Sequence, residues 1–231
     1  MRLEDKKKTK KKKKSEPESA EAQEFPQVPN NIIVLNTPSQ ESDTPKLRTM
    51  GIIGEIEEEK TSDILYGMLM MKQTSQREVA VDPENPEAGT KIEVDPFEII
   101  ISTYGGSAAE MFGIYDTMRK IRKECPILTC GIGKVMSAGV LLLAAGTKGN
   151  RRIGENCRVM IHDIQSATGG DVSNIQNEFE EIKWTQERYI EILSKETDMT
   201  KNHIKKLLSK KVNRYISAQE AVEFGIADEV F

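Results

Sequence analysis

Apolar and polar residues alternate with two different periods along residues 48–231. Short apolar runs that suit buried strands lie at residues 51–56, 97–102, 127–131 and 158–162 and again near the C-terminus. The first two runs are each followed by a segment in which apolar residues recur every three or four positions, as on one face of a helix. Repeated strand and helix units with buried strands predict an α/β domain.

The predicted helices differ in their apolar faces. The first follows Ser62, a candidate N-cap, and a second follows a glycine turn at residues 104–107. A short, nearly all-apolar helix after Ser137 suits the centre of the domain. The longest helix is predicted over residues 172–196, and two shorter helices and a final strand follow it. Periodicity favours a core-facing stripe on this longest helix, made of Val172, Ile175, Phe179, Ile182 and Leu193.

Composition sets the first 47 residues apart from the rest. Residues 1–14 hold nine basic and two acidic side chains, and Ser, Glu and Pro follow, so this segment cannot form a core. We expect residues 1–47 to be a disordered basic and polar tail that ends in a short docking arm, and residues 48–231 to form the folded domain. Within that domain, the polar residues 74–95, which contain Pro and Gly, predict a surface loop.

Charge and composition exclude several classes of protein. Of the 231 residues 37% are hydrophobic, and no apolar run reaches the ~18 residues that a membrane span needs. The net charge of −4 combines +7 on residues 1–14 with −11 on the rest, and an acidic body argues against specific nucleic-acid binding. Three cysteines without a CxxC pair support neither a disulfide framework nor a zinc site, so we expect a cytoplasmic protein. No GxGxxG or GxxxxGK[ST] motif is present, so no nucleotide cofactor is predicted.

The sequence offers one good general base and one well-placed hydroxyl. Of the two histidines, His203 lies in a charged helix, whereas His162 ends a predicted strand beside a Gly-rich loop. Ser137 lies at a turn into a helix, where free backbone N–H groups and the helix dipole favour an oxyanion. A serine at such a position is also a common N-cap, which is the alternative reading.

The glycine turn at residues 104–107 adds a second source of backbone N–H groups. If this turn and the turn at Ser137 follow neighbouring parallel strands, they lie side by side at the strand ends, where α/β folds bind ligands. An oxyanion hole needs that convergence. An ordinary glycine turn is the alternative.

Together these segments resemble the proteolytic subunits of Clp proteases. The pair Gly105-Gly106 precedes a helix that contains IYDTM, the turn at Met136-Ser137 precedes LLLAAGTKGNR, and RVMIH and ISAQEAVEFGIAD follow in order. The resemblance covers residues 48–231. It implies the fold of this family, which crotonases share, with repeated strand-helix units and a long handle helix.

The resemblance also implies a serine endopeptidase without a metal or other cofactor. In that reading Ser137 attacks the scissile carbonyl and His162 accepts its proton. The N–H groups of Gly105 and Ala138 would form the oxyanion hole. The residues that the resemblance assigns to substrate binding are Gly106 and Ile164.

The third member of the implied catalytic set departs from the family pattern. Where the family usually has Asp, the segment KKVNRYISA places Asn213. An asparagine can orient an imidazole but supplies no full charge to stabilise an imidazolium. Asp198 and Asp228 are alternative orienters, although their positions, at the end of the long helix and in the final strand, favour structural roles.

The same resemblance implies self-association into a heptameric ring or a stacked double heptamer, interlocked through the long helix and the segment before it. It also implies an AAA+ unfoldase partner that delivers unfolded polypeptides. Three alternatives remain open. They are a catalytically weak or silent ring subunit, which Asn213 favours, a maturation protease of the same fold, and a crotonase-type acyl-coenzyme A enzyme, which would not need the spacing of Ser137 and His162.

Overall fold

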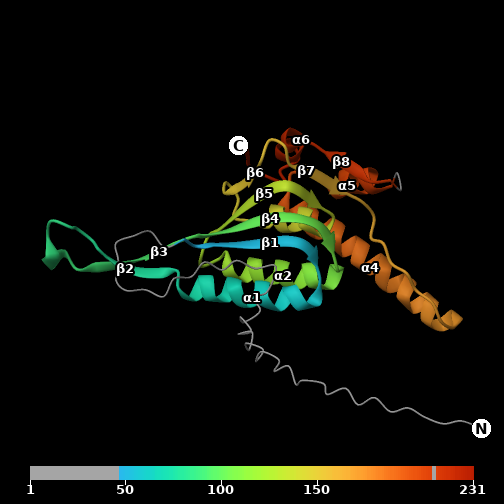
Figure 1. Ribbon diagram of the computed structural model, residues 1–231, viewed down its shortest axis with the longest axis horizontal. Helices are drawn as coiled ribbons and strands as arrows, with labels where there is room; N and C mark the ends of the chain where they lie inside the picture. The colour runs from blue at the N-terminus through green and yellow to red at the C-terminus, as the bar shows by residue number, and fades with distance from the viewer. Residues whose placement is uncertain (1–46, 210–211) are drawn as a thin grey trace, which may run out of the picture.

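A seven-stranded sheet forms the centre of the structure, a computed structural model that describes residues 47–209 and 212–231 (Figure 1). Its strands are β1 (Thr49–Ile56), β4 (Phe97–Gly106), β5 (Ile127–Met136), β6 (Arg151–Ile153), β7 (Arg158–Ile161), β8 (Arg214–Ile216) and β9 (Glu229–Val230). Five of them lie side by side in the order β1-β4-β5-β6-β9, and these neighbours are parallel. β7 pairs in parallel with β5 and antiparallel with β8. The predicted α/β fold is confirmed, whereas the expected tail lies, up to residue 46, outside the described residues.

Strand β5 has two partners along one edge. β6 pairs with residues 129–131 of β5, and β7 pairs with residues 134–136. Between these stretches Gly133 has a φ of +63°, which glycine adopts without a steric penalty, and the register of β5 against β4 shifts there as well. The edge of β5 is therefore divided between two partners at Gly133. Beyond this point β5 leads to Ser137, and its partner β7 leads to His162.

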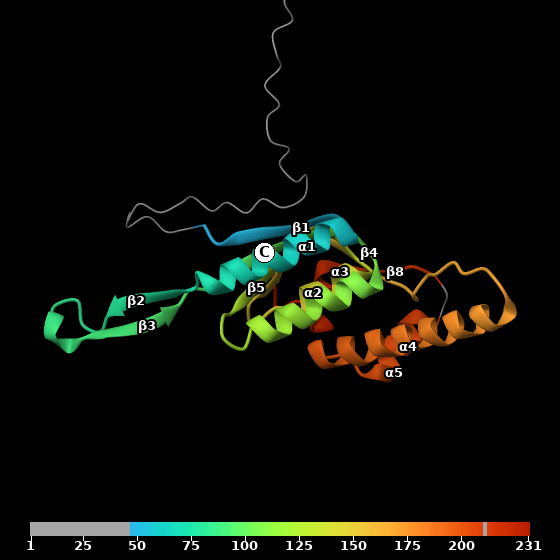
Figure 2. The ribbon, with the colours of Figure 1, turned by 90° about the horizontal axis from the view of Figure 1, so that it is seen from below.

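Six α-helices accompany the sheet in the described part of the chain. They are α1 (Glu58–Gln73), α2 (Ala108–Ile121), α3 (Ala138–Ala144), α4 (Val172–Glu196), α5 (Lys201–Leu208) and α6 (Ala218–Glu223). Helices α1, α2 and α4 lie on the same face of the sheet (Figure 1 and Figure 2). Helix α3 contacts α2 as well as β4 and β5, and all of its residues are buried, as the apolar composition predicted.

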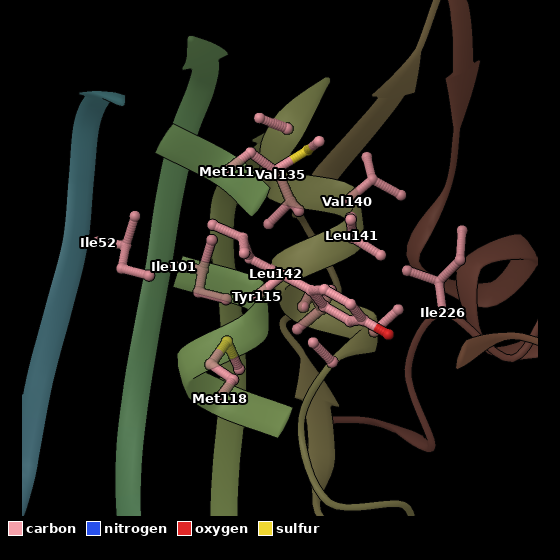
Figure 3. Packing of buried hydrophobic residues seen from close by; sticks show 14 of the residues in the cluster. Ile52, Ile101, Met111, Tyr115, Met118, Val135, Val140, Leu141, Leu142 and Ile226 are labelled. Atoms are coloured by element: carbon pink, nitrogen blue, oxygen red, sulfur yellow. The ribbon is translucent and has the colours of Figure 1, made fainter. Parts of the chain in front are cut away.

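Side chains from the sheet and from all six helices form the core, and Figure 3 shows a part of it around α2 and α3. Met111, Tyr115 and Met118 recur at helical spacing on α2 and are at most 2% exposed. Figure 3 shows them beside Leu142 of α3 and Ile101 of β4. Full burial of a Met, Leu or Ile side chain contributes about 1.5–3 kcal/mol. This packing holds α3, and with it the turn that precedes α3, against the sheet.

The first helix begins one turn earlier than predicted. α1 starts at Glu58, and the backbone carbonyl of Glu57 accepts hydrogen bonds from the N–H groups of Lys60 and Thr61. Ser62 therefore lies within the helix, and its predicted capping role is wrong. Acidic residues are favourable at the positive end of a helix dipole, so glutamates at this end replace a side-chain cap.

The segment predicted as a surface loop, residues 74–95, is instead a projecting hairpin (Figure 2). β2 (Gln76–Ala80) pairs antiparallel with β3 (Thr90–Val94), and a short 3-10 turn, η1 (Pro86–Ala88), lies near its tip. Polar residues and turn formers suppressed the strand signal in the sequence, although Val79 and Ile92 belong to this ladder. We call this segment the arm.

Arg48 holds the base of the arm against the domain. Its guanidinium donates hydrogen bonds to the carbonyl oxygens of Thr74 at 2.9 Å and of Pro96 at 3.1 Å. The Asp95 N–H donates to the Ser75 carbonyl at 2.8 Å. The chain therefore leaves the domain and returns to it at nearly the same point.

The prediction of a core-facing stripe is wrong for the first half of α4. The helix has the predicted bounds, but Val172, Ile175 and Phe179 are 72%, 41% and 54% exposed. Figure 1 and Figure 2 show that this half extends beyond the sheet, so no core lies opposite it. Leu193, in the second half, is fully buried as predicted.

A buried ion pair fastens the C-terminal strand to the sheet. The Arg151 side chain is 4% exposed and pairs with the Asp228 carboxylate at 2.5 Å. The same guanidinium donates hydrogen bonds to the carbonyl oxygens of Ala144, Glu196 and Gly225. One cation thus joins α3, the end of α4 and the C-terminal segment.

Asp228→Asn is expected to lower the free energy of unfolding by about 3 kcal/mol at neutral pH, because the Arg151 guanidinium stays buried without its counter-ion. Burial raises the pKa of Asp228. Hydrogen bonds from Arg151 and from backbone N–H groups lower it by a larger amount, so the pKa lies below its usual value. The pair therefore stabilises the fold above the unfolded-state pKa, and this contribution is lost as the pH falls through the folded-state pKa. Urea denaturation at neutral and acidic pH measures both effects.

The control for this prediction is the double variant Arg151→Met with Asp228→Asn. It is expected to recover part of the lost stability, because no buried charge is left unpaired. Equal stabilities of the wild type and Asp228→Asn at neutral pH would contradict the assigned role of the pair.

Candidate active site

Ser137 forms the sharp turn between β5 and α3. Among the described non-glycine residues it alone has a positive φ, at +53°. Its N–H donates to the Met160 carbonyl of β7 at 2.8 Å, and its own carbonyl accepts from the Val140 N–H at 3.0 Å. The Ser137 side chain makes no capping hydrogen bond, so the N-cap alternative does not describe it. A strained strand-to-helix turn of this kind presents a serine hydroxyl at the end of a sheet.

Gly105 approaches Ser137 more closely than a residue with a side chain could. A Cβ atom on Gly105 would lie 2.6 Å from Ser137 Cβ and 3.1 Å from Ser137 Oγ. Gly105 also has a φ of +105°, in the region that favours glycine. The two turns singled out in the sequence therefore converge at one point.

Thr103 lies beneath this glycine turn and is fully buried. Its hydroxyl accepts a hydrogen bond from the Gly105 N–H at 2.9 Å and donates one to the Gly54 carbonyl. The Gly105 N–H, predicted as an oxyanion donor, is thus engaged within the protein. Ala138, the other predicted donor, is the first residue of α3, where a backbone N–H has no partner within the helix.

His162 reaches the same place from the neighbouring strand. Met160 in β7 pairs with Met136 in β5, which is the residue before Ser137. Since adjacent strands lie about 4.8 Å apart, the residues that follow β5 and β7 are neighbours. The imidazole Nδ1 of His162 is buried and has no hydrogen-bond partner within the described residues. A hydrogen bond stabilises a buried imidazole nitrogen, so Nδ1 is the atom of His162 that an orienting residue would bind.

Asn213 lies near the end of the β7–β8 ladder but makes no hydrogen bond to the buried Nδ1 of His162. The ladder ends at the pair Ile161 and Arg214, and His162 and Asn213 are the residues directly beyond this pair. Asn213 is exposed, and the Nδ1 atom of His162 has no partner. In this conformation the amide of Asn213 does not orient the imidazole.

The two alternative orienting residues, Asp198 and Asp228, and the second histidine, His203, make structural contacts. Asp228 belongs to the ion pair at the C-terminal strand. Asp198 lies against Gly225, on which a Cβ atom would come within 2.5 Å of the Asp198 Oδ2. His203 packs edge-on against the Phe224 ring, with 5.1 Å between ring centroids. None of these contacts involves the residues at the ends of β5 and β7.

The two residues predicted to bind substrate have different surroundings. A Cβ atom on Gly106 would lie 2.0 Å from the Ile56 carbonyl oxygen, so the packing of β4 against β1 already requires glycine there. Ile164 is half-buried and lines a cavity of about 440 Å³ together with Ile182 and Leu208. Ile164 is therefore the one of the two that borders a cavity, whose lining also includes charged side chains such as Lys183 and Glu187.

Two residues of α4 contact this region and were not predicted. Gln186 binds the segment that follows His162. The Tyr189 hydroxyl donates to the Ser137 carbonyl at 3.4 Å, and burial raises the pKa of Tyr189, which keeps the hydroxyl protonated. The helical pattern places these residues on one face, three positions apart, but contains no signal for partners so distant in the sequence.

The described residues contain neither a transmembrane helix nor a cluster of metal ligands. None of their helices is long and apolar enough to cross a membrane. No group of three or more His, Cys, Asp or Glu side chains among them is arranged to hold a metal ion.

Known proteins match a large part of the chain. The Clp protease family model matches residues 89–231. The ATP-dependent Clp protease proteolytic subunit 1 of Salinibacter ruber is 36% identical over 135 residues, which are 58% of this chain and 56% of that protein. The protein of the same name from Leifsonia xyli subsp. xyli is 36% identical over 132 residues, 57% of this chain and 65% of that protein. The chain thus spans between half and two thirds of the length of these relatives.

The matched residues include the glycine pair, the turn at Ser137 and the strand that ends before His162. The family model covers more than half of the chain, and both converging turns lie inside it. The chain therefore belongs to the Clp protease family.

Proposed function

We propose that this chain is a serine endopeptidase, the proteolytic subunit of an ATP-dependent Clp-type protease. The observation that carries the proposal is the close approach of Gly105 to Ser137 at a strained strand-to-helix turn. The two relatives are named as proteolytic subunits of ATP-dependent Clp proteases. Residues 48–231 form the peptidase domain of this proposal, and residues 1–47 form a separate tail.

In the proposed reaction the Ser137 hydroxyl attacks the carbonyl carbon of a peptide bond and transfers its proton to His162. His162 gives this proton to the leaving amine, and the acyl group remains on Ser137 as an ester. A water molecule that His162 deprotonates then hydrolyses the ester and restores the serine. Two residues thereby perform both nucleophilic and acid–base steps.

Two backbone N–H groups bind the oxyanion in this proposal. The Ala138 N–H is available at the first position of α3. The Gly105 N–H donates to Thr103 in the present conformation, so it must turn from the threonine hydroxyl towards the oxyanion or be shared between them. Each donor of such a hole typically contributes about 10²–10³ in kcat.

Asn213 is the proposed orienting residue. It directly precedes Arg214, which pairs with the residue before His162, and this position supports the role. The buried Nδ1 of His162 is the group that the amide would bind. An amide oxygen accepts a hydrogen bond from Nδ1–H and thereby leaves Nε2 free to take the serine proton. An uncharged orienter stabilises the imidazolium less than Asp does, so a modest turnover is expected.

Ring assembly and an AAA+ unfoldase are further parts of the proposal, with a cytoplasmic location. A chamber formed by one or two heptamers would admit polypeptides that the unfoldase has unfolded. The exposed apolar half of α4 supports self-association, because Val172, Phe179 and Trp184 are more than half exposed and suit burial against another subunit.

A catalytically silent ring subunit is the second candidate function. The unpartnered Nδ1 of His162 and the exposed position of Asn213 favour it, because an imidazole without an orienter is a poor base. Fluorophosphonate labelling of Ser137 separates this candidate from the peptidase.

Fluorophosphonate labelling tests the nucleophile directly. An activated Ser137 is expected to carry the probe, as located by peptide mass, whereas Ser137→Ala and His162→Ala lose labelling because nucleophile and base act as a unit. Both variants are expected to keep the wild-type assembly and unfolding midpoint. Absence of labelling in an intact wild-type assembly would favour the silent subunit.

Asn213→Asp tests the orienter. A carboxylate at this position is expected to leave peptide hydrolysis unchanged or to raise it, because it adds a full charge beside the imidazolium. The measurement is kcat/KM on a short fluorogenic peptide. A fall to background in an assembly of unchanged size would contradict the role assigned to Asn213.

Gly105→Ala tests the close approach. The new Cβ would collide with Ser137, so labelling of Ser137 is expected to fall by at least about tenfold. Gly89→Ala is the matched control: Gly89 also has a positive φ, +81°, but no atom lies within 4 Å of the added Cβ. Gly89→Ala is expected to label like the wild type, and labelling of Gly105→Ala at the wild-type level would contradict the assigned role of the close approach.

A further inference from the structure

We propose that Gln186 of α4 is a positioning residue that fixes the segment directly after His162. This inference rests on the proposed function, because it concerns the same histidine. Gln186 lies in the sequence 24 positions after His162. Its amide is the group of α4 that hydrogen-bonds to this segment.

The Gln186 side chain makes two hydrogen bonds of opposite polarity. Its Oε1 accepts from the backbone N–H of Ile164 at 2.8 Å, and its Nε2 donates to the Asp163 Oδ1 at 3.1 Å. A carboxamide accepts from a backbone N–H through its oxygen and donates to a carboxylate through its nitrogen. The two bonds therefore use both ends of the Gln186 amide.

Both bonds are made to the two residues that follow His162, where the chain leaves β7. Residues beyond Ile161 no longer belong to the strand, and residues 162–169 form neither helix nor strand. Asp163 and Ile164 are half-buried, so a hydrogen bond there is partly shielded from water. Gln186 thus replaces, for this stretch, the ladder that holds β7 in place.

The same helix also touches the turn at the nucleophile. Tyr189 is three positions after Gln186 and donates to the Ser137 carbonyl. One rigid helix therefore contacts both the segment after His162 and the turn of Ser137. A shift of the first relative to the second changes the distance between base and nucleophile, and a misplacement of about 1 Å can lower a rate by about 10².

Three variants separate the two bonds. Gln186→Leu removes both. Gln186→Glu keeps the acceptor for Ile164 but places a carboxylate against Asp163, and adding Asp163→Asn to it exchanges amide and carboxylate so that both bonds can form again. Glu187→Leu, at the next and exposed position of α4, is the matched control, because Glu187 makes neither bond.

Hydrogen exchange at the Ile164 amide, read by mass spectrometry of full-length protein, tests the bond itself. Gln186→Leu is expected to exchange at least about tenfold faster than the wild type at this amide, and the double variant is expected to restore protection. Acylation of His162 by diethylpyrocarbonate is expected to accelerate in parallel, with His203 as the internal reference. Unchanged exchange and unchanged acylation in Gln186→Leu would overturn the proposal.

The kinetics of peptide hydrolysis are the third measurement. Gln186→Leu is expected to lower kcat by about tenfold and to raise KM, because the misplaced segment carries both the base His162 and the substrate-binding candidate Ile164. Glu187→Leu is expected to match the wild type, and the double variant to recover most of the loss. If Ser137 of the wild type is labelled and Gln186→Leu has the same kcat as the wild type, the positioning role is refuted. An unlabelled wild type would refute the proposed function instead, and exchange and acylation would still decide whether Gln186 holds the segment.

Discussion

The pairing of β5 with two strands along one edge is the constraint on which the site depends. β6 occupies the first half of that edge and β7 the second, so the strand that ends at the serine has the strand that ends at the histidine as its neighbour. A single continuous partner would have left no place for β7. The chemistry of the site therefore follows from a division of the sheet that Gly133 makes possible.

The unusual backbone of Ser137 is held in place from three sides. Its N–H is bound by β7, its carbonyl by α3 and by Tyr189 of α4, and its side chain lies against a glycine that leaves room for it. Strained conformations persist when the surrounding structure fixes them, and they concentrate at functional sites. The apolar packing of α3 against α2 and the sheet supplies the rigid base for this conformation.

Periodicity in the sequence was sufficient for the longer elements and for the converging turns, because both depend on local residues. It failed for β6 and β8, since three residues are too few to establish a period. It misassigned Val172 and Phe179, because exposure on a helix depends on whether the helix extends past the sheet. Gln186 could not be recognised, because its partners are 22 and 23 positions away and a lone glutamine on a helix has no signature.

The arm shows how this domain can accommodate a long insertion between α1 and β4. Because Arg48 binds both ends of the arm and the Asp95 N–H already meets the Ser75 carbonyl, the two ends are in contact without the hairpin between them. Both cations of the hairpin, Arg77 and Lys91, pair with acids of the arm itself or of its base. The segment is therefore a self-contained insert, which can be gained, lost or replaced during evolution while the sheet and the site stay as they are.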